Sequence, residues 1–229
     1  MERSVIEKIF AGKQIPCNFG PVECDEWSDT ISAFIQQFAD ADIEIHNGVS
    51  KCAIIIDNES QVIKVPFNGF YSTDEWDHED EFHSFEWAND LKAPNARNWD
   101  YCENELLKYK EAVHAGFGDF FAYTEYCTEI DGCPIYAQEK CVAISWGGSA
   151  KTEISDHACK IYKSNHDYDY ERLNEDWVCA AIDWYGEEEV LDFIYYLEEH
   201  NITDLHDGNV GFSAIDGRPV LIDWAGWRD

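Results

Sequence analysis

Basic residues are scarce in this sequence. Lysine and arginine together number 16 against 47 aspartates and glutamates, so the 229 residues carry a formal net charge of −31. A surface of that charge repels nucleic acid and anionic lipid, which excludes binding to a phosphate backbone by general electrostatics. Two explanations of this acidity stay open. It can serve solubility alone, or it can form a surface that attracts cations or a basic protein partner.

Long apolar runs and paired cysteine motifs are also missing. No apolar stretch approaches the roughly 20 residues that span a bilayer, and the charged residues 1–8 do not resemble a signal peptide. The nine cysteines include no Cys-x-x-Cys pair, so neither a disulfide framework nor a zinc ribbon is indicated. Free thiols fit a reducing compartment. We therefore expect a cytoplasmic protein without membrane contact.

Apolar residues are plentiful enough for a folded core. They make up 45% of the chain, and aromatics make up 15%, which excludes disorder. The length fits one large domain or two small lobes. Apolar residues recur at helical spacing around Ile6 and from Trp27 to Phe38, where Asp25 or Ser28 is a candidate cap, so residues 1–42 are predicted as a helical preface.

The rest of the chain divides into strand-rich and helix-rich parts. The excursion over residues 68–100 combines large aromatics with eight acids and no lysine or arginine between Asp74 and Asp90. The region after residue 141 is predicted to have little regular secondary structure until helical periodicity returns at residue 187. The predicted strands are 43–46, 52–56, 62–65, 120–128, 134–141, 209–212 and 219–222, and the predicted helices are 101–113 (with Cys102, Leu106, Tyr109 and Val113 on one face) and 187–200.

This order predicts an α+β fold in two lobes. Residues 43–141 would form a lobe with a small antiparallel sheet, interrupted by the acidic and aromatic insertion 68–100. Residues 142–229 would form a reduced, mainly helical lobe that ends in a hairpin.

Three polar residues near the end of the chain have the spacing of a phosphotransferase catalytic loop. Asp204 is followed five residues later by Asn209, and Asp223 comes after a short hairpin. An aspartate can orient an attacking hydroxyl, whereas an amide oxygen and a second carboxylate are hard ligands for Mg²⁺. A turn before a hairpin also favours Asp and Asn for local reasons. The position of Asp223 among apolar strand residues favours the functional interpretation.

At these residues the chain resembles the protein-kinase-like superfamily, particularly its aminoglycoside-phosphotransferase and small bacterial or phage branches. The resemblance implies a two-lobed kinase-like fold that binds ATP and Mg²⁺. It implies that Asp204 is the catalytic aspartate and that Asn209 and Asp223 hold the metal. If the protein is phage-encoded, its location would be the host cytoplasm.

The same resemblance assigns residues upstream. Lys64 matches the lysine that holds the phosphates, and Glu103 matches the helix glutamate that pairs with it. Glu139 and Cys141 fall where a strand would contact adenine through its backbone, and Gly48 is the single glycine in place of a glycine-rich loop. Two alternatives stay open at this point: Lys64 could protect an edge strand, and Glu105 lies on the same predicted helix as Glu103.

The sequence departs from the family pattern in three places. Ile202 occupies the position of the family's histidine before the catalytic aspartate, so one hydrogen bond of the loop is lost. Trp224 replaces the phenylalanine that follows the metal-binding aspartate. Six residues follow Asp223, so the surface on which protein kinases bind peptides is not expected. His206, within the loop, is expected to support the turn.

Two functions therefore remain open. The first is an ATP- and Mg²⁺-binding phosphotransferase that acts on a hydroxyl or on itself. The second is a non-catalytic interaction protein of the phage-inhibitor or nucleic-acid-mimic type, in which a kinase-like scaffold presents carboxylates to a basic protein partner.

Overall fold

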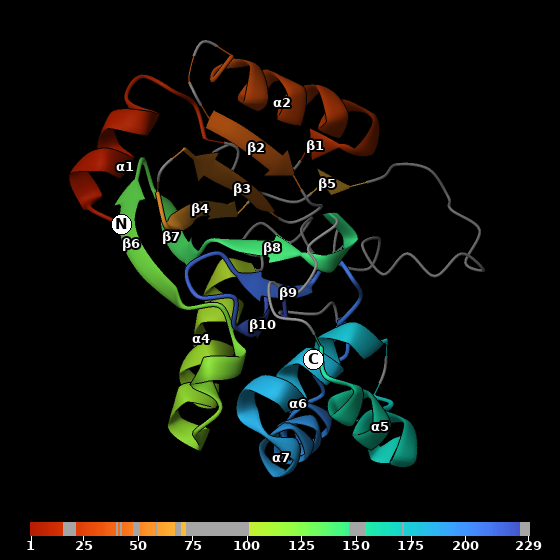
Figure 1. Ribbon diagram of the computed structural model, residues 1–229. Helices are drawn as coiled ribbons and strands as arrows, with labels where there is room; N and C mark the ends of the chain where they lie inside the picture. Colours follow the sequence, from red (N-terminus) through yellow and green to blue (C-terminus); the bar gives the residue numbers. More distant parts are fainter. Residues whose placement is uncertain are drawn as a thin grey trace. The chain divides into compact units, whose positions relative to one another are not determined.

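The computed structural model describes the chain except residues 16–21, 40, 42, 48–50, 58, 67–69, 72–100, 147–153, 171 and 225–229 (Figure 1). Two compact units can be distinguished. The first comprises Met1–Asn104 and Glu125–Gln138, and the second comprises Glu105–Thr124 and Glu139–Asp229. The α+β class is as predicted. The division differs from the predicted boundary after residue 141, because residues 105–124 belong to the second unit.

A five-stranded sheet forms the centre of the first unit, in the order β2-β3-β4-β7-β6. The predicted hairpin is confirmed, since β3 and β4 pair antiparallel with Ile54 opposite Ile63. A second hairpin turns at Asp131 and Gly132, between β6 and β7. Both residues have positive φ, 52° and 83°, as a tight two-residue hairpin turn requires. The strands are β2 (Ile43–Asn47), β3 (Lys51–Ile56), β4 (Gln61–Pro66), β6 (Thr124–Ile130) and β7 (Cys133–Glu139).

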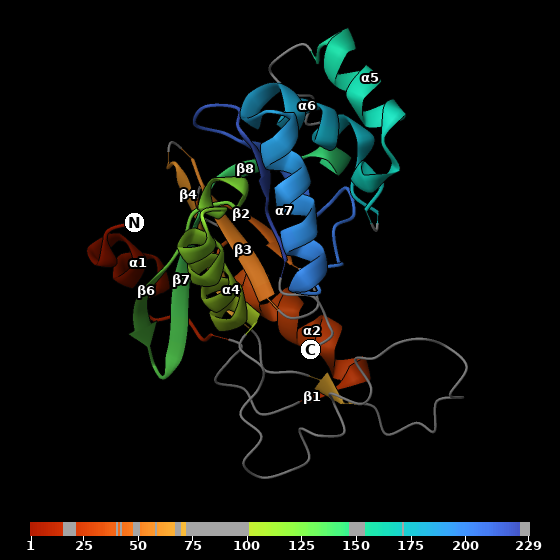
Figure 2. The same ribbon diagram turned by 90° about the horizontal axis from the view of Figure 1, so that it is seen from below.

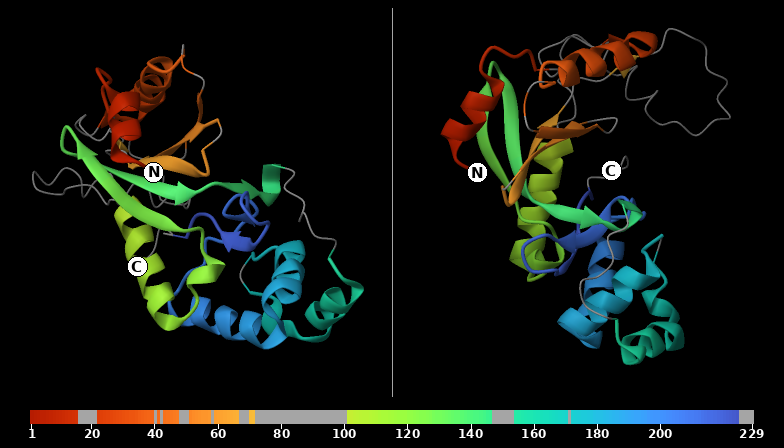
Figure 3. Two further views of the ribbon diagram at one scale, coloured as in Figure 1. Left: turned by 60° about the vertical axis from the view of Figure 1, so that its left-hand side comes forward. Right: turned by 45° about the horizontal axis from the view of Figure 1, so that its top comes forward.

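Two helices supply the apolar layer that covers this sheet. Helices α1 (Arg3–Phe10) and α2 (Cys24–Gln36) lie within the residues predicted as a helical preface, and α2 begins before both predicted caps. Figure 3 shows both helices against the strands of this unit. Strands β1 (Val22–Glu23) and β5 (Phe70–Tyr71) form a separate parallel pair. The shared core consists of Ile6, Phe10, Ile15, Ile31, Phe34 and Phe38 together with Cys52, Ile54, Ile63, Val65, Cys133 and Ile135.

The second unit contains a three-stranded sheet in the order β10-β9-β8. Strands β9 (Val210–Ser213) and β10 (Pro219–Leu221) confirm the predicted terminal hairpin, and β8 (Cys141–Ala143) joins β9 from far upstream. Gly211 is required at this junction, because a Cβ atom there would lie 2.2 Å from the carbonyl oxygen of Val142. The close approach of β8 to β9 therefore depends on a residue without a side chain.

Helices pack around this sheet (Figure 2). The indole nitrogen of Trp177 donates to the carbonyl oxygens of Gly211 and Val220, both at 3.2 Å, and Phe193 stacks on Phe120 with ring centroids 4.0 Å apart. These contacts join α6 and α7 to the hairpin and to the segment after α4. The helices are α4 (Tyr101–Ala115), α5 (Asp156–Ser164), α6 (Glu175–Tyr185) and α7 (Glu187–Glu199), with 3-10 turns at Gly118–Phe120, Ile144–Trp146 and His166–Tyr168.

Several sequence expectations are corrected here. Helices α5 and α6 occupy much of the region expected to be loose. Val113, predicted to share one face of the helix with the buried Cys102, is 50% exposed, whereas Ala112 is fully buried. Residues 118–120 form a 3-10 turn, so the strand expected from residue 120 begins at Thr124.

The cysteine expectation is also wrong at one residue. Cys133 is disulfide-bonded, while the free cysteines of the described part are Cys52, Cys102, Cys127, Cys141, Cys159 and Cys179. This disulfide removes the argument from free thiols to a reducing compartment. Among the described residues, no helix is long and apolar enough to cross a membrane.

Buried tyrosines make the second unit sensitive to alkali. Burial raises the pKa of Tyr168 and of Tyr196 to about 12, and it also raises the pKa of Tyr185. In the unfolded chain these phenols titrate near about 10, so above that pH the unfolded state loses protons that the folded state keeps. The free energy of unfolding should therefore stay level below about pH 9 and fall between about pH 10 and 12.

Denaturant unfolding at a series of pH values measures this effect. Tyr168→Phe should reduce the alkaline loss, whereas Tyr126→Phe, which alters an exposed ring, should leave it unchanged. A free energy of unfolding that stays level or rises over this interval would contradict the prediction.

Candidate functional site

The loop from Asp204 to Asn209 follows α7 and precedes β9 in the second unit. Its start is fixed by apolar packing, because Ile202 and Leu205 both belong to the core of that unit. The amide of Ile202 also donates to the carbonyl oxygen of Leu197 at 2.9 Å. Ile202 is thus held by apolar packing and by a backbone hydrogen bond.

Asn209 closes this loop through its side chain and its backbone. Its side-chain nitrogen Nδ2 donates to the carbonyl oxygen of Asp204 at 2.7 Å, and its amide donates to the carbonyl oxygen of His206 at 2.7 Å. The residue is 8% exposed. Because Nδ2 is held by Asp204, the amide oxygen Oδ1 points away from that carbonyl and is oriented by the same bond.

Asp223 is tied to the same asparagine. The carbonyl oxygen of Asn209 accepts from the amides of Ile222, at 2.7 Å, and Asp223, at 3.3 Å. The next residue, Trp224, is 1% exposed and donates its indole N–H to the carbonyl oxygen of Glu105 at 3.0 Å. The structure therefore brings Asp204, Asn209 and Asp223 together within the second unit.

The carboxylate of Asp204 is accessible. It is 36% exposed, and its Oδ1 lies 3.9 Å from Nε2 of His206. His206 accepts a hydrogen bond from the amide of Gly208 on its other nitrogen, at 3.0 Å, which agrees with the predicted role of this histidine in supporting the turn. A solute can therefore reach the carboxylate of Asp204, as it can that of Asp207, which is exposed in the same loop.

A neighbouring helix holds the middle of the loop. The N-cap residue of α6, Asn174, donates its side-chain N–H to Oδ1 of Asp207 at 2.9 Å, and the amide of Ser145 donates to the carbonyl oxygen of Asp207 at 3.0 Å. The sequence does not indicate this contact, because it joins residues 33 positions apart. The loop is thus fixed at both ends and at its centre.

Glu139 lies in a buried ion pair. Its carboxylate is 5% exposed and accepts from Nη2 of Arg218 at 2.7 Å, from the amide of Tyr123 at 3.1 Å, and from the hydroxyl of Ser213. Burial lowers the pKa of Arg218, but Glu139, Tyr185 and Asp216 together raise it by more, so the pKa is raised overall. The side chain predicted only to mark a nucleotide contact therefore anchors the end of β7 to the terminal hairpin.

The backbone around Glu139 is also engaged. The amide of Glu139 donates to the carbonyl oxygen of Tyr123 at 2.7 Å, and the carbonyl oxygen of Lys140 accepts from Ala214 at 2.8 Å. The thiol of Cys141 donates to the carbonyl oxygen of Glu139 at 3.3 Å. Residues 139–141 are therefore held in one conformation by the hairpin next to them.

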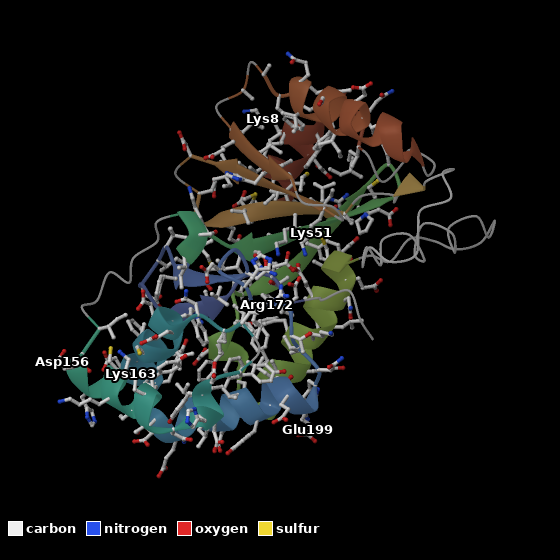
Figure 4. The ribbon with its side chains drawn as sticks, turned by 90° about the vertical axis from the view of Figure 1, so that its right-hand side faces the viewer. Lys8, Lys51, Asp156, Lys163, Arg172 and Glu199 are labelled. Carbon is white, nitrogen blue, oxygen red and sulfur yellow. The ribbon has the colours of Figure 1, made fainter. Side chains whose placement is uncertain are left out.

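Lys64 is on the inner strand β4 of the first unit and is 4% exposed. Its neighbours Ile63 and Val65 face the core, so strand alternation places Lys64 on the opposite face. A second lysine, Lys51 (Figure 4), is 9% exposed on the adjacent strand, two residues from the cross-strand partner of Lys64. The edge-strand explanation for Lys64 is wrong, because β4 is not an edge strand.

The two glutamates at the start of α4 differ in burial. Glu103, predicted to pair with Lys64, is exposed, whereas Glu105 is fully buried. Buried carboxylates persist in proteins when they are paired or hydrogen-bonded. Burial therefore identifies Glu105, which the sequence left as an alternative, as the glutamate on the enclosed side of this helix.

Two predicted features lie outside the described residues. Gly48, the one glycine in place of a glycine-rich loop, is among them, and so is most of the insertion 68–100. Within the part of the chain that the structure describes, no group of three or more His, Cys, Asp and Glu side chains is placed to hold a metal ion. The assignment of Asn209 and Asp223 as metal ligands stays a prediction from the sequence.

No protein-family model, no curated protein and no solved structure matches this chain. Functional assignment consequently depends on the geometry of the loop and on the chemistry of its residues.

The difference in burial between Glu105 and Glu103 can be tested by stability. Glu105→Gln replaces an enclosed carboxylate with an amide. It should lower the free energy of unfolding by about 3 kcal/mol, because the groups that interact with the buried carboxylate lose their charged partner. Glu103→Gln, the matched control one half-turn away, should change it by less than about 0.5 kcal/mol. Equal effects in urea denaturation would contradict the assignment.

Proposed function

We propose that the protein binds ATP with Mg²⁺ in a kinase-like manner and that its second unit carries the residues for phosphoryl transfer to a hydroxyl. One observation carries the proposal: Asn209 is bonded through its side chain to Asp204 and through its carbonyl oxygen to the amide of Asp223. This arrangement supports a shared site for three residues that are 19 positions apart at most.

Asp204 is proposed to serve the attacking hydroxyl. Its carboxylate is accessible, and its backbone is fixed by the Asn209 side chain, so it can accept a hydrogen bond from a hydroxyl without reorganising the loop. His206 and Gly208 hold the turn that carries it. The acceptor hydroxyl would belong to a small molecule or to the protein itself.

Asn209 and Asp223 are proposed to hold Mg²⁺. An amide oxygen and a carboxylate suit this hard cation, which usually keeps several waters and phosphate oxygens among its ligands. The donor set fits, because the bond from Nδ2 of Asn209 to Asp204 leaves an oxygen, not a nitrogen, directed elsewhere. When bound, the metal would supply charge neutralisation at the phosphates.

The remaining assignments follow the family resemblance. Lys64 is proposed to contact phosphate and Glu103 to act with it, although burial favours Glu105 as the enclosed glutamate of α4. Glu139 and Cys141 would contact adenine through the backbone that the Glu139–Arg218 pair fixes, and Gly48 would approach the phosphates. The kinase-like arrangement and a cytoplasmic location belong to the same proposal.

A second candidate function is binding of a basic protein. Helix α7 begins with Glu187, Glu188 and Glu189, and the segment 183–199 also exposes two aromatic side chains, Trp184 at 43% and Tyr195 at 47%. Aromatic residues are favoured at the centres of interfaces. Such a complex would weaken steeply as salt rises, whereas nucleotide affinity held by direct metal contacts would respond less.

Removing the proposed metal ligand gives the first test of nucleotide binding. Asp223→Ala should abolish the Mg²⁺-dependent part of ATP affinity, because the variant lacks the carboxylate, while the fold is retained. Isothermal titration with and without Mg²⁺ measures this. Asp192→Ala, which removes an exposed carboxylate of α7, is the matched control and should bind like the wild type. Unchanged affinity in Asp223→Ala would refute the metal assignment.

The role of Asp204 is separable from binding. Asp204→Asn should retain Mg²⁺-dependent ATP affinity but lower the rate of phosphate incorporation or ATP hydrolysis by at least about 100-fold, because the amide is a poor acceptor for the hydroxyl proton. Mass analysis of the protein and release of ADP provide the readouts. A variant as active as the wild type would show that another group serves the nucleophile.

A further inference from the structure

Helices α5 and α6 run antiparallel, and polar contacts fix their register. At one end, Ser155, the N-cap of α5, donates from its amide and its hydroxyl to the carboxylate of Asp183, at 2.7 and 2.6 Å. At the other end, Nζ of Lys163 lies 3.3 Å from Oε1 of Glu175. Figure 4 labels Asp156 and Lys163 at the two ends of α5.

The midpoint of this register brings two cysteines together. Cys159 lies four residues after Ser155 and four before Lys163, and Cys179 lies halfway between Glu175 and Asp183. Residues four apart lie on the same face of a helix, so Cys159 and Cys179 are the expected central pair of the interface. Both are free thiols, with Cys179 1% exposed and Cys159 half-buried.

The two thiols also interact with each other. Burial raises the pKa of Cys179 to about 12, and its interaction with the Cys159 thiol acts in the same direction. Cys159, the more accessible of the two, is therefore the thiol that an external reagent meets first.

We propose that Cys159 and Cys179 form a redox-active pair that closes into a disulfide by exchange with a low-molecular-weight disulfide such as oxidised glutathione. The Cys159 thiolate attacks one sulfur of the oxidant and releases one small thiol. Cys179 then loses its proton and attacks the Cys159 sulfur, which releases the second small thiol. Two electrons pass to the oxidant, and the two cysteine protons end on the two released thiols.

This modification would join α5 covalently to the helix that supports the candidate loop. The side chain of Asn174, the N-cap of α6, is bonded to Asp207. The pair is independent of the proposed nucleotide chemistry, because neither cysteine touches Asp204, Asn209 or Asp223 in the contacts that define that loop.

Peptide mapping after oxidation tests the proposal. The 229-residue chain, not reduced beforehand, is incubated with oxidised glutathione, alkylated and digested. The expected product is a cross-linked peptide pair that contains Cys159 and Cys179, with loss of both free thiols. Cys127→Ser, which removes another half-buried free cysteine, is the matched control and should give the same cross-link.

The single variants separate the two steps. Cys179→Ser should accumulate Cys159 as a mixed disulfide with glutathione, whereas Cys159→Ser should leave Cys179 unmodified. The wild-type result alone can overturn the proposal: a stable mixed disulfide at Cys159, no reaction at either residue, or a cross-link from either residue to a different cysteine would each contradict it. Far-ultraviolet circular dichroism confirms that each variant is folded before it is compared.

Discussion

The candidate site depends on the hydrogen bonds of one asparagine. Asn209 donates to the carbonyl oxygens of Asp204 and His206 and accepts from the amides of Ile222 and Asp223. These bonds close the loop and join it to the strand that follows the hairpin. In a largely buried residue such a set is costly to lose, because every partner would be left without its bond. The same residue therefore explains both the shape of the loop and the proximity of the two aspartates.

Cations are too few in this chain to neutralise its acids, and several of them are used inside the fold. Lys51 and Lys64 are buried in the first unit, and the side chain of Arg218 is 16% exposed beside Glu139 in the second. Burial of a cation is normally unfavourable, but a nearby carboxylate favours the charged form. The pKa of Arg218 is raised overall, because Glu139 and the other groups around it together outweigh burial. These three cations are therefore structural components of the fold and not part of its exposed surface.

The parts of the fold that sequence could predict are those with a clear period or a turn. The 52–56 and 62–65 hairpin, α7 and the terminal hairpin combine apolar patterns with turn residues, and all are confirmed. Helix α6 was missed because every residue from Trp177 to Ile182 is buried, so no polar face reveals the helical period. Helix α5 was missed for the opposite reason, since Ala158 is its one buried residue.

The candidate site was predictable to a similar degree. Spacing alone predicted that Asp204, Asn209 and Asp223 lie together, since a loop and a short hairpin keep residues close in sequence close in space; their roles stay a prediction. It could not identify the contact between Asn174 and Asp207 or the burial of Glu105, because these depend on which helix packs beside the loop and on which face of α4 is enclosed.

The number of cysteines predicts which of them pair less well than does the alignment of the helices that carry them. An odd number without paired spacing indicated free thiols, yet Cys133 is disulfide-bonded. Cys159 and Cys179, twenty residues apart in sequence, meet because two antiparallel helices align Ser155 with Asp183 and Lys163 with Glu175. Disulfide formation requires specific Cα and Cβ geometry, not sequence spacing. Polar contacts at both ends of the helix pair thus determine the chemistry available at its centre.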